Sequence, residues 1–140
     1  MNAPVPDILP VETIKDGDQT LAVFIRASTQ RDRTEFVTAP DQSMQVGFVA
    51  YGKGGEIARH FHKPVERALT GTAEVLVVQK GAAEIDVYND AKELVATRRV
   101  SQGDTIVLAA GGHGLRMTED TVFLEVKQGP YVGVDEKVFF

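Results

Sequence analysis

The feature that most constrains this chain is a series of short runs rich in Val, Ile, Thr and Phe, each ended by Gly, Pro or Asn-Asp. Residues with branched or aromatic side chains favour strands, and these turn residues end them. No segment has a sustained helical period. The sequence therefore predicts an all-β fold, with strands at residues 21–26, 45–51, 56–62, 74–80, 83–88, 93–100, 105–109 and 121–127.

Alternation within "VVQKGAAEIDVYND" indicates how such strands pack. Ile85 and Val87 alternate with Glu84 and Asp86, so one face is expected to be buried and the other wet. Turns at "NDAK" and "SQGD" then space the strands by roughly 8 to 12 residues, which is typical of an antiparallel sandwich or barrel. The polar residues 26–43 are expected to form a loop.

Length, charge and cysteine content narrow the classes of partner. A chain of 140 residues with 43% apolar and 25% charged residues is typical of one globular domain. The net charge is -5 and no basic cluster occurs, so we expect no nucleic-acid partner. No apolar stretch approaches the roughly 18 residues of a membrane span, and no export signal is recognisable, so we expect a cytoplasmic protein that does not enter membranes. Without cysteine, any metal must be held by nitrogen and oxygen.

Two of the three histidines lie one residue apart, at His60 and His62. In a strand they project to the same side, while Phe61 projects to the other. Imidazole is the commonest protein metal ligand, so the pair suggests a metal site. The alternative is two ordinary strand histidines, exposed or hydrogen-bonded.

His113 and Glu74 are the further candidate ligands. His113 follows a predicted strand in the glycine-rich stretch "GDTIVLAAGGHGLRM". Glu74 shares the parity of Leu76 and Val78, which we expect to face the core. An isolated buried carboxylate is too costly, so Glu74 is expected to have a cationic partner.

These residues resemble the two motifs of the cupin superfamily. Gly54, His60 and His62, followed by Glu74 with six residues between it and Gly81, are similar to the first motif, and "GDTIVLAAGGH" is similar to the second. The resemblance implies an antiparallel β-barrel, the double-stranded β-helix or jelly roll. It would form one domain over residues 1–140, with an N-terminal arm or edge strand at 1–20 and the barrel core at 45–127.

The spacing inside the first motif departs from that of the family. Eleven residues separate His62 from Glu74, where cupins usually have three or four. Glu66 has the shorter spacing, but Ala73 stands where the motif requires glycine. Glu66 therefore remains an alternative ligand, and "KPVERALTGTA" is interpreted as an inserted loop at the barrel mouth.

The resemblance implies that His60, His62, Glu74 and His113 hold one divalent transition metal at that mouth. Three imidazoles and one carboxylate suit Fe, Mn, Ni, Cu or Zn, and do not choose among them.

Four further residues are candidates for contact with a small polar ligand. Glu125 and Lys127 share one face of a predicted strand and would look into the cavity if the valine face packs outward. Glu125 is then a candidate proton acceptor and catalytic residue, and Lys127, Arg67 and Tyr131 are candidate substrate-binding residues. The alternative is a solvent-exposed Glu/Lys pair and a solvated loop arginine.

Three functions fit this sequence. The first is a metalloprotein that binds one divalent ion and a small polar ligand, with an enzyme of sugar or small-acid metabolism as one form of it. The second is a metal-independent isomerase or epimerase of nucleotide-linked sugars, and the third is a non-enzymatic binding module. The apolar end "KVFF" and the expected free sheet edges also predict a homodimer.

Overall fold

The computed structural model describes residues 9–133 and 136–140, and over these residues the fold is all-β with antiparallel pairing and no α-helix. The N-terminal arm or edge strand was predicted at residues 1–20, of which residues 1–8 lie outside the described residues. In the described part, no helix is long and apolar enough to cross a membrane. The strands are β1 (Val11–Asp16), β2 (Gln19–Ile25), β3 (Glu35–Phe36), β4 (Gly47–Phe48), β5 (Glu74–Lys80), β6 (Ala82–Tyr88), β7 (Leu94–Ser101), β8 (Thr105–Leu108), β9 (Gly112–Met117) and β10 (Val122–Lys127).

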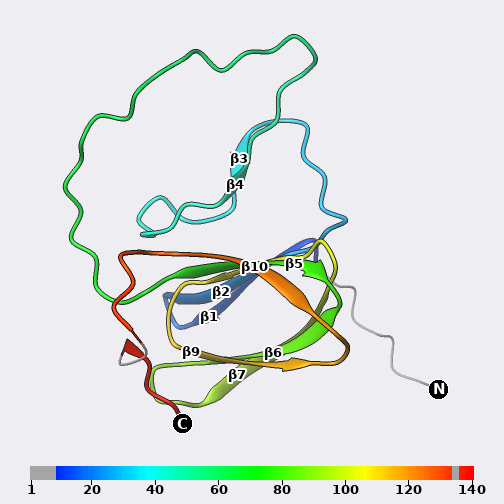
Figure 1. The fold of residues 1–140 in the computed structure, drawn as a ribbon, viewed down its shortest axis with the longest axis vertical. Helices are drawn as coiled ribbons and strands as arrows, with labels where there is room; N and C mark the ends of the chain where they lie inside the picture. The colour runs from blue at the N-terminus through cyan, green and yellow to red at the C-terminus, as the bar shows by residue number, and fades with distance from the viewer. Residues whose placement is uncertain (1–8, 134–135) are drawn as a thin grey trace.

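Two sheets stack face to face (Figure 1). The larger has the order β1-β2-β8-β5-β10, the smaller has the order β7-β6-β9, and a separate hairpin pairs β3 with β4. The chain passes from one sheet to the other at β5–β6, β7–β8, β8–β9 and β9–β10. Among the described residues the two sheets are not hydrogen-bonded into a closed barrel, and the jelly-roll arrangement stays a prediction.

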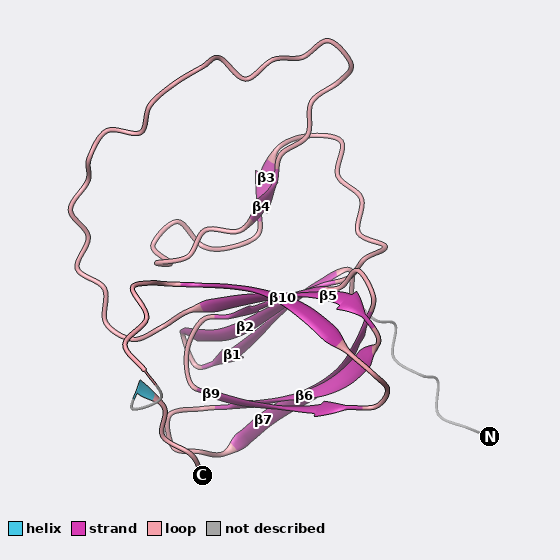
Figure 2. Cartoon of the chain, viewed as in Figure 1, coloured by secondary structure: helices cyan, strands magenta, loops and turns pink. Residues whose placement is uncertain are grey.

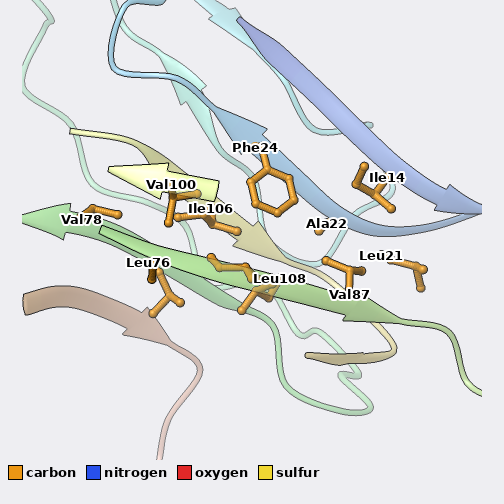
Figure 3. Packing of buried hydrophobic residues seen from close by; sticks show 12 residues of the cluster. Ile14, Leu21, Ala22, Phe24, Leu76, Val78, Val87, Val100, Ile106 and Leu108 are labelled. Atoms are coloured by element: carbon orange, nitrogen blue, oxygen red, sulfur yellow. The ribbon is translucent and has the colours of Figure 1, made fainter. Parts of the chain in front are cut away.

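The space between the sheets is filled by one apolar cluster (Figure 3). Phe24 and Ile106 of the larger sheet and Ile85 of the smaller one are fully buried in it. Burying a side chain of this size contributes about 1.5–3 kcal/mol, so this cluster is the main force that holds the two sheets together.

The outer face of the larger sheet is also covered. Val46 and Phe48 from the β3–β4 region pack against the apolar cluster on this face, which includes Val75 and Val107. A strand covered on both faces reads as a continuous apolar run rather than an alternating one, which explains "EVLVV" in β5 and "LAVFI" in β2. Only Gly47–Phe48 of the strand predicted at 45–51 is a strand here.

The prediction of a strand at residues 56–62 is wrong. These residues belong to a long loop (residues 51–72), in which every residue is exposed and none is in a strand (Figure 2). Alternation of side chains describes the shape of a strand, but a strand also needs hydrogen bonds from a neighbouring backbone. Residues 56–62 find no such neighbour in the described part of the chain.

Three strands lie outside the eight predicted from the sequence, and one of them, β3, falls in the predicted loop at residues 26–43. Residues 11–16 form β1, the edge strand that was one of the two alternatives for the N-terminal region. β9 spans residues expected to form a glycine-rich turn, and it exists because it pairs with β6 along its whole length. Its sequence "GHGLRM" has no run of β-branched residues, so the propensity of its own residues did not reveal it.

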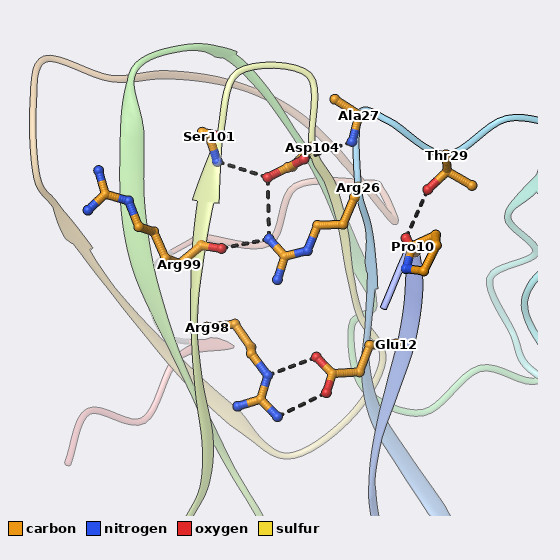
Figure 4. Close-up of polar contacts among 9 residues, drawn as sticks. All are labelled: Pro10, Glu12, Arg26, Ala27, Thr29, Arg98, Arg99, Ser101 and Asp104. Carbon is orange, nitrogen blue, oxygen red and sulfur yellow. Dashed lines mark hydrogen bonds and ion pairs between the residues drawn. The ribbon is translucent and has the colours of Figure 1, made fainter. Parts of the chain in front are cut away.

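A buried carboxylate joins the two sheets at one corner (Figure 4). Asp104 accepts hydrogen bonds from the backbone N–H groups of Ala27 (2.8 Å) and Ser101 (2.9 Å), and from the guanidinium of Arg26 (3.3 Å). Arg26 also donates to the carbonyl oxygen of Arg99 in β7. The side chains of Arg26 and Asp104 are 10% and 8% exposed, and the three hydrogen bonds to the carboxylate are partly buried, so removing the carboxylate leaves several shielded donors unsatisfied.

We therefore predict that Asp104→Ala lowers the free energy of unfolding by about 3 kcal/mol, the usual cost of breaking a buried ion pair. Denaturant unfolding followed by circular dichroism measures this loss. Asp120→Ala, in the exposed turn before β10, is the matched control and is expected to change stability by no more than about 0.5 kcal/mol. Equal stability of the two variants would contradict the structural role of Asp104.

Candidate functional site

A cavity of about 410 Å³ opens at the end of the sheets where β5 and β9 begin. Its walls are Glu74, the glycine-rich start of β9 with His113, the end of the long loop at residues 71–72, and the C-terminal segment 136–140. This size is within the range of small-molecule sites. Two of the four predicted metal ligands therefore line one hollow.

Glu74 and His113 contact each other in this cavity. Glu74 is the first residue of β5 and shares the parity of Leu76 and Val78, which are buried in the core between the sheets. The Nε2 atom of His113 lies 3.3 Å from Oε2 of Glu74. The exposed fractions of the two side chains are 14% for Glu74 and 33% for His113, so the pair is shielded but reachable by a ligand.

The surroundings of Glu74 favour its charged form. The hydrogen bond from His113 holds the pKa of Glu74 below its ordinary value, against the opposing effect of burial. The charge of His113, a hydrogen bond with Glu125 and the charge of Lys127 add smaller lowering effects. Glu74 is thus an anionic oxygen donor with an imidazole beside it.

β10 supplies further polar groups to the same face. Glu125 and Lys127 lie opposite Leu76 and Glu74 in the pairing of β10 with β5. Phe123, two residues before Glu125, packs against the core cluster, so this parity is the inner one. Glu125 itself is exposed. Neither Glu125 nor Lys127 lines the cavity itself, so their contact with a ligand there and the catalytic role of Glu125 stay predictions.

Lys127 has an anionic partner and an aromatic neighbour. Its Nζ atom lies 3.6 Å from Oε1 of Glu136 and 5.9 Å from the centre of the Tyr131 ring. Tyr131 is largely exposed. A ligand anion at this position would therefore compete with Glu136 for the ammonium group.

His60 and His62 lie together, but not with the other two candidate ligands. Their ring centres are 5.1 Å apart, and Nδ1 of His60 is 2.7 Å from the carbonyl oxygen of Ala58. Both residues are exposed on the long loop. Among residues 9–133 and 136–140, no three His, Cys, Asp or Glu side chains are gathered as a metal would require. The structure therefore forms two separate pairs, Glu74 with His113 and His60 with His62.

The remaining candidates on the long loop are also apart from the cavity. Glu66 and Arg67 are exposed, and Arg67 lines a different hollow of about 680 Å³ beside the loop at residues 40–45. Neither residue is part of the wall that contains Glu74. Contact of Arg67 with a ligand in the Glu74 cavity would require the long loop to move.

The C-terminal segment 136–140 lines the cavity, and the sequence did not predict it as part of the site. The apolar "KVFF", which together with free sheet edges predicts a homodimer, forms one wall of the cavity here, and the homodimer stays a prediction. The ring of Phe140 packs edge-on against Tyr88 with centres 5.0 Å apart. A Cβ atom on Gly112 would lie 2.9 Å from that ring, so the glycine permits the close approach.

No protein-family model, no curated protein and no solved structure matches this chain. What the site can do follows from its own groups: an anionic carboxylate and an imidazole in contact, an ammonium group close by, and a hollow large enough for a small molecule. Such a set can bind a cation, transfer a proton, or hold an anionic group of a ligand.

The lowered pKa of Glu74 predicts how its contribution to stability depends on pH. Its pKa is lower in the folded chain than in the unfolded one, so between the two values the unfolded state binds more protons. The stabilisation is therefore present above about pH 4.5, the ordinary value, and is lost as pH falls through the lowered folded pKa. We expect the difference in free energy of unfolding between wild type and Glu74→Gln to shrink over that acidic window. Denaturant curves at several pH values measure it, and a constant difference would contradict the Glu74–His113 contact.

Proposed function

We propose that this chain is a cupin-like metalloprotein that binds one divalent transition metal and a small polar ligand. Glu74 and His113 are its donors on the sheets, and His60 and His62 are its donors on the long loop. The observation that carries the proposal is the contact of Glu74 with His113 in a 410 Å³ cavity. A cavity that holds a carboxylate and an imidazole together offers two donors that Fe, Mn, Ni, Cu and Zn accept.

All four side chains are of types that bind such metals. Only Glu74 and His113 of the four lie together in the cavity. Two protein donors are fewer than the three or four that such ions usually take from a protein. The other two donors are already close to each other on the long loop, with ring centres 5.1 Å apart. When bound, a divalent ion would supply Lewis acidity toward a ligand oxygen.

The neighbouring side chains favour an anionic or hydroxyl-bearing ligand. Lys127 offers an ammonium group, and Tyr131 beside it offers a hydroxyl and an aromatic face. Glu125, on the same face of the sheet as Glu74, is positioned to accept a proton from a ligand hydroxyl. We propose binding at this place and assign no particular reaction.

One observation favours a second function, which needs no metal. The Glu74–His113 contact of 3.3 Å is the arrangement in which a carboxylate orients an imidazole for proton transfer. With Lys127 contacting a phosphate, the same cavity would suit an isomerase or epimerase of nucleotide-linked sugars. The metal content of the protein separates the two functions.

We predict that untagged chain, incubated with each of the five metals and freed of excess, retains about one ion per chain, as a tight site fills nearly stoichiometrically. His113→Ala and Glu74→Gln are expected to retain less than roughly a tenth of that, because each removes a donor. Elemental analysis by mass spectrometry measures the content.

Glu119→Gln is the control for the loss of one carboxylate, since Glu119 is exposed in the turn after β9; it should retain the wild-type content. Wild-type protein that retains less than roughly a tenth of an ion with every metal would overturn the metal site. It would leave the acid–base function as the better account of Glu74 and His113.

A further inference from the structure

The long loop is exposed to a degree that a single copy of the chain does not account for. All of residues 51–72 are exposed, and Phe61 is 99% accessible. Four more large side chains on the loop are at least half exposed, namely Tyr51, Ile57, Val65 and Leu69. Ordering a chain costs about 1–2 kcal/mol per residue in backbone entropy, and burial normally offsets that cost. An apolar, extended segment of this kind is therefore expected to pack against another surface.

Among the described residues, the two stacked sheets have four edge strands without a second neighbour, β1, β7, β9 and β10, and two of these edges concern the site. Within the described residues, β9 pairs only with β6, and β10 pairs only with β5. A free edge presents unpaired N–H and C=O groups that accept an added strand. Both edges bear site residues, since His113 is on β9 and Lys127 is on β10. The outer face of β10 is also apolar and about half exposed, at Val122, Leu124 and Val126.

Residues 56–62 of the long loop match what the β9 edge lacks. In an added strand, His60 and His62 would project to one side, with Phe61 on the other. Neighbouring strands lie about 4.8 Å apart, so histidines on the inner side of a strand beside β9 would come within reach of His113 and Glu74. The addition would thus join the two separate pairs of donors and bury part of Phe61.

We propose that this addition occurs between two copies of the chain: each copy lays its long loop along the β9 edge of the other, and His60 and His62 of one copy complete the site of Glu74 and His113 in the other. The inference rests on the proposed metal-binding function and names its partner. It makes each site dependent on both copies.

The points at which the long loop is attached favour its binding to the β9 edge of a second copy over its binding to the β9 edge of its own chain. The loop leaves from the β3–β4 hairpin, whose Phe48 packs on the outer face of the larger sheet, opposite the face that bears Glu74. From there it runs away from both sheets and returns only at β5 (Figure 1). Glycines with positive φ, Gly54 (85°) and Gly71 (83°), stand near its two ends and allow turns that other residues rarely adopt.

Length and symmetry are consistent with the exchange. The 25 residues between β4 and β5 span at most about 80 Å when extended, enough to reach a second copy and return. In a two-fold dimer the exchange is reciprocal, so that both loops gain a surface and both β9 edges gain a strand. The contact of the long loop with the β9 edge of the other copy would bury the exposed loop, pair the free edge and bring the four metal donors together.

Complementation between two defective chains tests this inference. One chain carries His60→Ala and His62→Ala, and the other carries Glu74→Gln and His113→Ala, each with a different affinity tag. The two are co-expressed, and mixed dimers are isolated through both tags and loaded with metal. Under exchange, one site combines the two altered halves and the other combines the two intact halves. We expect about one ion per mixed dimer and almost none in either parent dimer.

The outcomes separate the exchange from the metal site itself. A mixed dimer without metal, beside a wild-type protein that binds one ion per chain, would overturn the exchange and leave the metal site standing, because each site would then lie within one chain. A metal-loaded wild type that elutes as a monomer would do the same. A wild type that binds no metal would overturn the proposed function, and the exchange of ligands with it. The single changes His62→Ala and His113→Ala repeat the test with less risk to folding.

Discussion

The burial of both faces of β5 is the constraint on which the site depends. Leu76 and Val78 are buried between the two sheets, and Val75 is buried on the opposite face under the β3–β4 region. Because both faces are occupied, β5 cannot rotate or slip by one residue without exposing one apolar set. Glu74, at the start of the same strand, is thereby held on the inner face, where burial makes a partner necessary. That partner is His113.

The site is accordingly built from a rigid half and a loosely held half. Glu74, His113, Glu125 and Lys127 stand on strands that are packed on the core, so their mutual geometry is set by the sheets. His60, His62 and Arg67 stand on the long loop, which is exposed along its whole length. Any function that needs both sets requires an event that brings the loop to the sheets, and that event is itself a point at which binding can be controlled.

The C-terminal segment adds a third element to this arrangement. Glu136 pairs with Lys127, and Phe140 packs on Tyr88, so the tail forms a wall of the cavity with contacts at both of its ends. Phe139 and Phe140 nevertheless remain largely exposed. Among the described residues, the tail is held by the partly exposed ion pair of Glu136 with Lys127 and by the contacts of Phe140 with Tyr88 and Lys92, each of which contributes little on its own.

Most of the strands could be predicted from the sequence, because β2, β5, β6, β7, β8 and β10 carry apolar residues in patterns that only a strand would bury. The inner position of Glu74 follows from the same patterns. The strand nature of residues 112–117 and the loop at 51–72 could not be predicted in this way. β9 is a strand because β6 supplies its hydrogen bonds, and residues 56–62 are not a strand because no described segment supplies theirs. By itself the sequence determined which segments are able to form strands and which face each presents. Only the tertiary structure decided which strands are paired, because hydrogen bonds between strands come from residues far apart in the chain.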